Sequence, residues 1–374
     1  MGGAFSLGRI FGIQFRIHYS WFFIFVLITV SLSLQYFPYA YPEWSTPTYW
    51  LTGIATSLLF FTSVVAHELA HSLVGRANGI PVRSITLFIF GGVAHMAREA
   101  TRHGAEFRMA LAGPLASLVI GGLFFLLYLV LQSISETVAA LAFWLAQINV
   151  VLALFNLIPG FPLDGGRVFR SLLWRFSGNY QRATRIAVEV GRSVGYLFIL
   201  AGIVLMFIYP GRWFNGLWLA FIGLFLTYVA TASYRQARWQ AALQGVRVAD
   251  VMTTTCPAIS PDMTISRVVQ DYIFVSGYQC FMVTADRELK GILTLQNIKS
   301  VDRKAWETAS VSQVMTPVER LKVVQPDEEV LSVIEQMEEY GISQMPVASE
   351  GRIIGLVTRD DVLRLLYTRS RLGV

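Results

Sequence analysis

Three residues in one apolar stretch have the types and spacing that catalysis requires. His67, Glu68 and His71 follow a run of apolar and small residues, in the order His-Glu-Leu-Ala-His. On a helix, residues four apart lie about 40° apart around the axis, so both imidazoles face one point. Glu68 lies about 100° away, where it can reach a water at that point without being a ligand. The pattern is typical of zinc hydrolases.

A catalytic zinc ion needs three protein ligands and one open position. Asp164 is a candidate third ligand, because it belongs to a segment with two prolines and three glycines within eight residues, which cannot remain a regular helix. Unwound backbone at membrane depth is tolerated only where it is buried in protein or lines a wet cavity. Asp164 could instead be a capping or turn aspartate. His95 and His103 are rival ligands, although a solvent-exposed loop histidine is the commoner interpretation of both.

The composition predicts that this motif lies in a membrane protein. Hydrophobic residues make up 54% of the 374 residues and charged residues only 14%, against about 25% charged in soluble proteins. This excludes disorder, a disulfide scaffold and a wholly soluble globule. The runs long enough to cross about 30 Å of hydrocarbon lie at 17–37, 50–75, 107–131, 139–158, 187–209 and 213–234.

The arginines predict the orientation of these six helices. Residues 1–240 hold 16 Arg, no Lys and 7 acidic residues. Of these arginines, 14 lie before, between or after the helices on one side, and only Arg212 lies in the loops of the other side. The positive-inside rule therefore places both termini and the loops at 76–106 and 159–186 in the cytoplasm. The pI of 9.4 describes this membrane part, and no nucleic-acid partner is needed to explain it.

The segment from Ile80 to Met96 is predicted to be a short strand or hairpin beside the second helix. It alternates apolar residues at Ile85, Leu87 and Ile89, and it contains the pair Gly91-Gly92. A free strand edge there would hold an extended peptide by main-chain hydrogen bonds. Such an edge has a mechanistic purpose, because a transmembrane helix must unwind before water can attack one of its carbonyls.

Four motifs together resemble a known family. They are His67-Glu68-Leu69-Ala70-His71, Phe90-Gly91-Gly92-Val93-Ala94, Ala112-Gly113-Pro114 and Asn156…Pro159…Pro162-Leu163-Asp164-Gly165-Gly166. In this order they resemble the site-2 protease family of intramembrane zinc metalloproteases, in particular the branch with a pair of cystathionine-β-synthase-type (CBS) domains at its C-terminus. The likeness covers essentially the whole chain.

The resemblance implies a role for each matching residue. The implied roles are zinc ligands for His67, His71 and Asp164, general base for Glu68, substrate positioning or oxyanion stabilisation for Asn156, and a clamp on the unwound peptide for the strand around Gly91 and Gly92. In that chemistry the metal polarises the scissile carbonyl and lowers the pKa of water towards about 7. Glu68 takes the water proton and later gives it to the leaving amine.

The C-terminal part contains an internal repeat with a period of about 63 residues. Residues 248–253 match residues 311–316, and residues 291–298 match residues 355–362. The repeat resembles a tandem CBS (Bateman) pair, an α/β module that often binds ATP or another adenine nucleotide. Two cysteines fall in this part, Cys256 and Cys280, and we expect free thiols there.

The resemblance also indicates which residues would contact a nucleotide. In CBS domains a Thr-x-x-Asp sequence meets the ribose and phosphates, and the second repeat keeps it as Thr358 and Asp361. The first repeat has Thr294 and Asn297, and a neutral amide binds a ribose hydroxyl less strongly than a carboxylate does. The alternative is a purely structural dimerisation module.

These observations predict a polytopic α-helical membrane protein with a small β-hairpin and a C-terminal tandem CBS domain. The expected domains are a six-helix metalloprotease domain at 1–240 and CBS repeats at 246–303 and 308–372. We expect one zinc per chain, a transmembrane or membrane-tethered protein substrate cut by regulated intramembrane proteolysis, contact with membrane lipid, and a homodimer formed through the CBS repeats.

Two other classes of function deserve comparison with this prediction. A nucleotide-regulated channel or transporter is disfavoured, because nothing resembles a selectivity filter or paired broken helices. A catalytically inactive membrane scaffold would lack Glu68 or one of the candidate ligands, and all four groups are present.

Overall fold

The computed structural model describes residues 4–372 except for 81, 90, 97–99, 209–210, 212, 255, 279, 287 and 351, and it leaves out the side chains of 83, 95, 96, 236, 240, 241 and 370–372. Phe90, Arg212 and the side chain of His95, which the sequence analysis used, therefore lie outside the described residues. The chain divides into two compact units, Met1–Ala237 and Arg238–Val374. Each unit is considered by itself.

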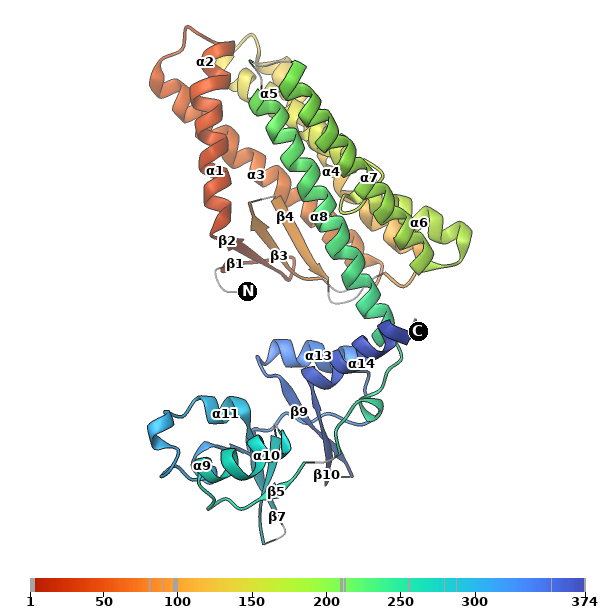
Figure 1. The fold of residues 1–374 in the computed structure, drawn as a ribbon. Helices are drawn as coiled ribbons and strands as arrows, with labels where there is room; N and C mark the ends of the chain where they lie inside the picture. The colour runs from red at the N-terminus through yellow and green to blue at the C-terminus, as the bar shows by residue number, and fades with distance from the viewer. Residues whose placement is uncertain are drawn as a thin grey trace. The chain divides into compact units, whose positions relative to one another are not determined.

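The first unit is a bundle of long apolar helices (Figure 1). In the described chain, six helices are long and apolar enough to cross a membrane, which confirms the predicted membrane fold. The first, Ser20–Ala40, consists of α1 (Ser20–Ser31), a π-helical turn (Leu32–Tyr36) and α2 (Phe37–Ala40). The others are α3 (Thr46–Ala77), α4 (His103–Leu131), α5 (Glu136–Asn156), α7 (Tyr180–Ile208) and α8 (Trp213–Leu243).

Glycines let several of these helices approach closely, as is common in membrane bundles. A Cβ added to Gly121 of α4 would lie 3.2 Å from the carbonyl oxygen of Ala146 on α5. Between α7 and α8, a Cβ added to Gly202 would lie 2.5 Å from the carbonyl oxygen of Gly216. Backbone contact of this kind replaces the hydrophobic driving force that is absent between helices in lipid.

The hairpin predicted at Ile80–Met96 is present, and it belongs to a larger sheet. Its strands β3 (Val82–Phe88) and β4 (Gly91–Met96) pair antiparallel. The sequence analysis did not predict the two strands before them, β1 (Ala4–Ile10) and β2 (Ile13–His18). The sheet order is β1-β2-β3-β4, with β2 parallel to β3, so β4 is an edge strand among the described residues.

The Pro/Gly segment after α5 leaves the helix, as the sequence predicts. Helix α5 ends at Asn156, residues 157–163 are turns and bends, and α6 (Asp164–Ser177) starts at the candidate ligand. This connection is packed against α7, because a Cβ added to Gly160 would lie 2.5 Å from the Cα of Gly191. The chain therefore turns sharply here, with Gly160 and Phe161 buried against protein.

The second unit contains two α/β repeats. Its first sheet has the order β5-β6-β7-β8 and its second pairs β9 with β10. The strands are β5 (Ala258–Ile259), β6 (Cys280–Ala285), β7 (Glu288–Thr294), β8 (Thr316–Pro317), β9 (Gln344–Ser349) and β10 (Arg352–Thr358). The helices are α9 (Ile265–Val268), its π-helical continuation (Val269–Ile273), α10 (Phe274–Ser276), α11 (Leu295–Lys299), α12 (Val311–Val314), α13 (Val330–Glu339) and α14 (Arg359–Leu372).

The cores of the two repeats exchange their N-terminal segments. Val311, from the start of the second repeat, is fully buried in the core that holds Phe281 of the first. Val248, from the start of the first repeat, is fully buried in the core that holds Met337 of the second. Each repeat therefore completes its hydrophobic core with residues from the other, so neither is an independent packing unit.

Candidate metal centre

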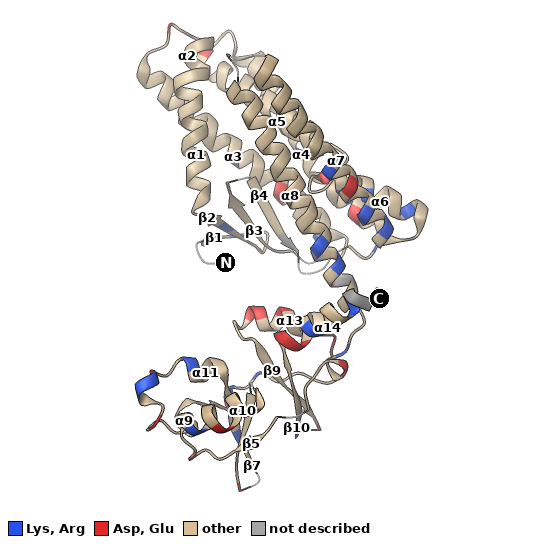
Figure 2. Ribbon diagram, in the orientation of Figure 1, with Lys and Arg blue, Asp and Glu red and all other residues tan. Residues whose placement is uncertain are grey.

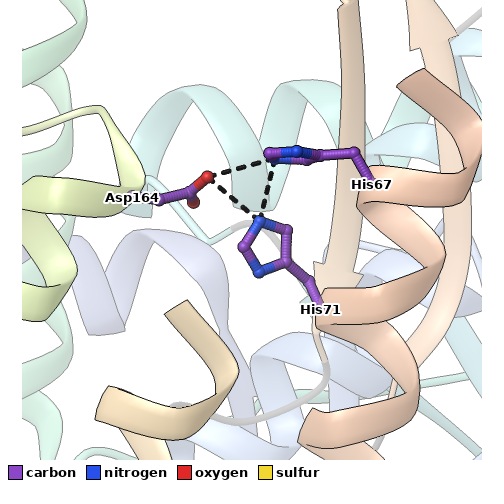
Figure 3. Close-up of side chains that lie close together, drawn as sticks. All are labelled: His67, His71 and Asp164. Carbon is purple, nitrogen blue, oxygen red and sulfur yellow. Dashed lines mark hydrogen bonds and ion pairs between the residues drawn. The ribbon is translucent and has the colours of Figure 1, made fainter. Parts of the chain in front are cut away.

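Two elements that are distant in sequence bring three donor side chains together. His67 and His71 lie on α3, and Asp164 is the first residue of α6; all three side chains point toward one another (Figure 3). Oδ2 of Asp164 lies 3.2 Å from Nε2 of His67 and 3.0 Å from Nε2 of His71, and the two Nε2 atoms are 3.1 Å apart. The three side chains are 3%, 8% and 18% exposed for His67, His71 and Asp164, so the cluster is almost closed to solvent.

Hydrogen bonds on the far side of each imidazole orient the two rings. Nδ1 of His71 donates to the carbonyl oxygen of Met109 at 2.7 Å, and Nδ1 of His67 is 2.9 Å from the hydroxyl of Ser117. A carbonyl oxygen only accepts, so Nδ1 of His71 carries a proton. When the ring is neutral, Nε2 then has no proton, and its lone pair is directed at Asp164. Such a bond to the remote nitrogen is the usual support of a metal-binding histidine.

Gly113 of α4 leaves the space that lies among these donor atoms. A Cβ at this position would lie 2.1 Å from Nε2 of His71 and 2.6 Å from Nε2 of His67. Real Cβ atoms essentially never approach so closely. A side chain of any size at Gly113 would therefore fill the point on which the donors converge.

Glu68 lies beside the edge strand of the sheet. It is half-buried on α3, one residue after His67. A Cβ added to Gly92 of β4 would lie 2.4 Å from its Cγ and 3.3 Å from its Oε1. The neighbouring Gly91 has a φ of +119°, which L residues with side chains rarely adopt. The glycine pair thus lets β4 pass directly against the Glu68 side chain.

A buried ion pair holds α6, and with it Asp164, against α4. The guanidinium of Arg170 donates through Nε to Oε1 of Glu106 at 2.7 Å and also through Nη2. Both residues are almost fully buried. The same guanidinium lies 4.8 Å from the ring centroids of Phe161 and Tyr180. Arg170 therefore connects α4, the turn before α6 and the start of α7.

The described side chains of the other two histidines do not belong to this cluster. His103 begins α4, is exposed, and has its ring centroid 6.1 Å from that of Trp174. His18 lies on β2, with its Nδ1 2.8 Å from the hydroxyl of Ser20. Asn156 is the half-buried last residue of α5. Among the described side chains, the only group with ligand atoms gathered within 4.8 Å is the one formed by His67, His71 and Asp164.

The sequence analysis missed several residues that shape the site. Gly113 appeared there only as part of a family motif. Its lack of a side chain was the signal that space must be kept free at this position. No spacing rule singles out Ser117 or the carbonyl of Met109, because their contacts depend on how α4 packs against α3. The sequence does predict that Glu106 pairs with one of the many loop arginines, which the structure confirms, but no spacing rule singles out Arg170 as that partner.

The four CBS residues named from the sequence form two matching sets of bonds. Oδ2 of Asp361 accepts from the hydroxyl of Thr358 at 2.7 Å, and Oδ1 of Asn297 accepts from the hydroxyl of Thr294 at 2.6 Å. Asp361 and Asn297 each also form a hydrogen bond with a threonine at the start of the other repeat. The hydroxyl of Thr253 donates to Oδ1 of Asp361, and Nδ2 of Asn297 donates to the hydroxyl of Thr316, both at 3.3 Å.

The two cysteines are free thiols, as expected. The hydrogen bond with Cys256, together with burial, raises the pKa of the Cys280 thiol well above its usual range. This environment favours the neutral thiol form of Cys280.

Comparison with family models gives two matches that together span most of the chain. The model described as Peptidase family M50 matches residues 55–134 and 131–202, which contain the three donor residues and Glu68. The model described as CBS domain matches residues 248–304 and 311–368.

Curated relatives match along the full length of the chain. It is 35% identical to the zinc metalloprotease sll0528 of Synechocystis over 99% of this chain and 98% of the relative. It is 36% identical to the zinc metalloprotease Rip3 of Mycobacterium tuberculosis over 98% of this chain and 93% of that relative. Among solved structures, the site-2 protease from Methanocaldococcus jannaschii is 28% identical, with a TM-score of 0.43 over 62% of this chain and 95% of its own.

The buried ion pair leads to a prediction about stability. Replacing Arg170 by Gln leaves the Glu106 carboxylate buried without its charged partner, which we expect to lower the free energy of unfolding by about 3–5 kcal/mol. Arg175→Gln, on the exposed face of the same helix, is the matched control and should change it by less than about 1 kcal/mol. Reversible unfolding of the purified full-length protein in detergent measures both values; equal losses would contradict the assigned role.

Proposed function

Since the chain belongs to peptidase family M50, as a zinc metalloprotease of the site-2 type with two CBS domains, we propose that it cleaves transmembrane or membrane-tethered proteins at a zinc ion held by His67, His71 and Asp164. It is a multi-pass membrane protein, and its family implies membrane-protein substrates. The observation that carries the proposal is the convergence of three donor atoms from α3 and α6 within 3.0–3.2 Å of one another.

The donor set fits zinc in number, type and spacing. Two imidazole nitrogens and one carboxylate oxygen are the ligands that a catalytic zinc site combines with one open position. In a tetrahedral site with bonds of 2.0–2.2 Å, ligand atoms lie about 3.3–3.5 Å apart, a few tenths of an ångström more than the separations found here. The space kept free by Gly113 supports the same assignment.

The proposed chemistry assigns the proton transfers to Glu68. When bound, Zn²⁺ supplies Lewis-acid polarisation of the scissile carbonyl and acidifies water that it contacts. The Glu68 carboxylate takes a proton from the attacking water and delivers it to the leaving amine nitrogen. Ser117 and the Met109 carbonyl keep both imidazoles facing the reaction. The roles of Asn156, Gly91 and Gly92 in binding the substrate stay predictions.

The edge of β4 that does not pair with β3 is the proposed binding site for the substrate backbone. β4 pairs with β3 on one side, and the described chain provides no strand for the other side. An extended peptide added there would gain main-chain hydrogen bonds. Because Gly92 lies against Glu68, the added peptide would pass close to the general base. This edge therefore combines unwinding of the substrate with its placement at the catalytic carboxylate.

The arginine distribution supports a cytoplasmic location for this end of the bundle. Figure 2 shows Lys and Arg gathered around α6 and the adjoining end of α8, at the end of the helices that carries the sheet. The excess of positive charge at one end predicts its orientation. On this proposal both termini and the CBS repeats are cytoplasmic, and water reaches the site from that side.

Adenine-nucleotide binding to the CBS repeats is the proposed regulatory input. Asp361 and Asn297 occupy equivalent positions, each hydrogen-bonded across to the other repeat. A ligand whose ribose hydroxyl donated to Oδ1 of Asp361 would replace the bond from Thr253, and one that accepted from Nδ2 of Asn297 would replace the bond to Thr316. Either would thereby act on the contact between the two repeats. Pairing of two chains through these repeats stays a prediction.

The catalytic role of Glu68 is tested by Glu68→Gln. The amide is isosteric with the carboxylate but cannot accept the water proton, so cleavage of a tagged single-span substrate should fall by about 10²–10⁴-fold. Glu189→Gln, at an exposed site on α7, is the control and should cut normally. Metal analysis should find about one zinc per chain in all three proteins. Normal cleavage by Glu68→Gln would exclude it as the base.

The ligand set is tested by Gly113→Ala. The new methyl group would occupy the point on which the donors converge, so zinc content should fall to less than about a tenth of the wild-type value. Gly122→Ala is the matched control, because a Cβ there has no atom within 4 Å. Elemental analysis of purified full-length proteins distinguishes the two. Full zinc occupancy in Gly113→Ala would place the metal elsewhere.

The regulatory proposal is tested by Asp361→Asn. Asn297 shows that an amide keeps the threonine bonds at this position, so the fold should be preserved while the charge is lost. Exchanging a charged for a neutral acceptor should weaken ATP binding to the full-length protein about tenfold in calorimetry. The exposed neighbour offers the control Asp360→Asn. Equal affinity in all three proteins would remove Asp361 from the nucleotide site.

A further inference from the structure

A basic cavity opens at the N-terminal end of α4, away from the donor cluster. It has a volume of about 590 Å³, and its lining includes Asn78, Arg102, His103, Arg108 and Trp174. These residues come from the end of α3, the start of α4 and the last turn of α6. The proposed function makes no use of this cavity.

Among the residues that the structure describes, the charge of the cavity is positive. The described part of its lining contains two arginines and no carboxylate. The guanidinium of Arg108 donates to Oδ1 of Asn78, a neutral group. In the part of the chain that the structure describes, neither Arg102 nor Arg108 forms a salt bridge. The nearest acidic residue of α4, Glu106, is buried and paired with Arg170. Such a pocket attracts an anionic group.

An apolar groove continues from the basic cavity along α3 and α4. Its volume is about 620 Å³, and it is lined by Ala70, Val74 and residues of α4 from Phe107 to Ile120. Arg108 lines both cavities, so they meet at this side chain. At 1.5 Å per residue the groove extends about 20 Å along α4, slightly more than one leaflet of hydrocarbon.

We propose that the two cavities form one binding site for an anionic phospholipid. Its phosphate lies between Arg102 and Arg108, and one acyl chain follows the groove past Val74 towards Ile120. Basic pockets at the cytoplasmic end of transmembrane helices bind such headgroups. The indole of Trp174 beside the cavity is suited to headgroup depth.

The combination of cavities is what selects this ligand over others. A free phosphate would contact only the two arginines, and an uncharged lipid would contact only the groove. A substrate helix in the groove would not require the positive charge. An anionic phospholipid alone uses both cavities, across the shared side chain of Arg108.

Binding at this site would stabilise α3 and α4, two of the three helices that form the proposed catalytic centre. Helix α3 carries His67 and His71, while α4 carries Gly113 and the groups that orient both rings. A ligand lying along the seam between them holds their mutual position. The effect is therefore measurable as thermal stability, independently of any proteolysis.

The test uses the delipidated full-length protein in an uncharged detergent, with native mass spectrometry and thermal unfolding as readouts. Phosphatidylglycerol should be retained and should raise the Tm. Phosphatidylcholine with the same acyl chains, whose choline cation offsets its phosphate, should bind much more weakly, and inorganic phosphate should neither be retained nor raise the Tm. Two arginine contacts correspond to an affinity ratio of about 30-fold between the two lipids. Equal binding of both lipids, or stabilisation by phosphate alone, would overturn the proposal.

Two pairs of variants separate headgroup from chain binding. Arg102→Gln with Arg108→Gln should abolish the preference for phosphatidylglycerol, whereas Arg182→Gln with Arg185→Gln, two exposed arginines outside both cavities, should leave it intact. Ala116→Phe should fill the groove and weaken lipid retention, while Gly122→Phe, in open space on the same helix, should not. If the control arginine pair lost the preference equally, the binding would be general surface attraction and the site would be refuted.

Discussion

Three electron-pair donors held within 3.2 Å of one another, almost out of reach of solvent, are the constraint around which this protein is arranged. Because the Nδ1 proton of His71 is committed to the Met109 carbonyl, the donor atoms present lone pairs to one another unless a cation or a shared proton lies among them. Buried groups of this kind are tolerated only when they are paired. The surrounding helices therefore have to hold the donors against mutual repulsion whenever neither a cation nor a shared proton lies among them.

That requirement explains why the packing around the cluster depends on glycines, which have no side chain, as much as on the side chains that form contacts. Gly113 keeps the centre open, Gly92 lets β4 touch Glu68, and the contact between Gly160 and Gly191 sets the turn that delivers Asp164. The Glu106–Arg170 pair then fixes α6 against α4 from its buried side. Asp164 gains further support from its place in the first turn of α6, where the helix dipole favours a carboxylate.

Hydropathy and spacing were sufficient to predict the six helices, the His-Glu-x-x-His motif on the second, the hairpin at Ile80–Met96 and the CBS repeat, because each depends on local pattern. The strands β1 and β2 were missed, since six or seven residues next to a long apolar run give no separate signal. The roles of Ser117 and Arg170 were also missed. Both depend on which helices meet, and no periodicity within one helix contains that information. The exchange of Val248 and Val311 between the CBS cores is hidden for the same reason.

The edge of β4 that no described strand covers explains how the proposed reaction could be energetically feasible. A transmembrane helix satisfies all its backbone groups internally, and each N–H or C=O freed in hydrocarbon costs several kcal/mol. A few residues beside Glu68 can therefore unwind only if their backbone N–H and C=O groups find new hydrogen-bond partners at once. A strand edge without a partner strand provides them. It follows that a substrate should unwind most easily where its helix is already weak, at Gly or Pro. At such a position the helix loses fewer internal hydrogen bonds than the peptide gains from the strand edge. On this argument substrate selection resides in the stability of the substrate helix as much as in its side chains.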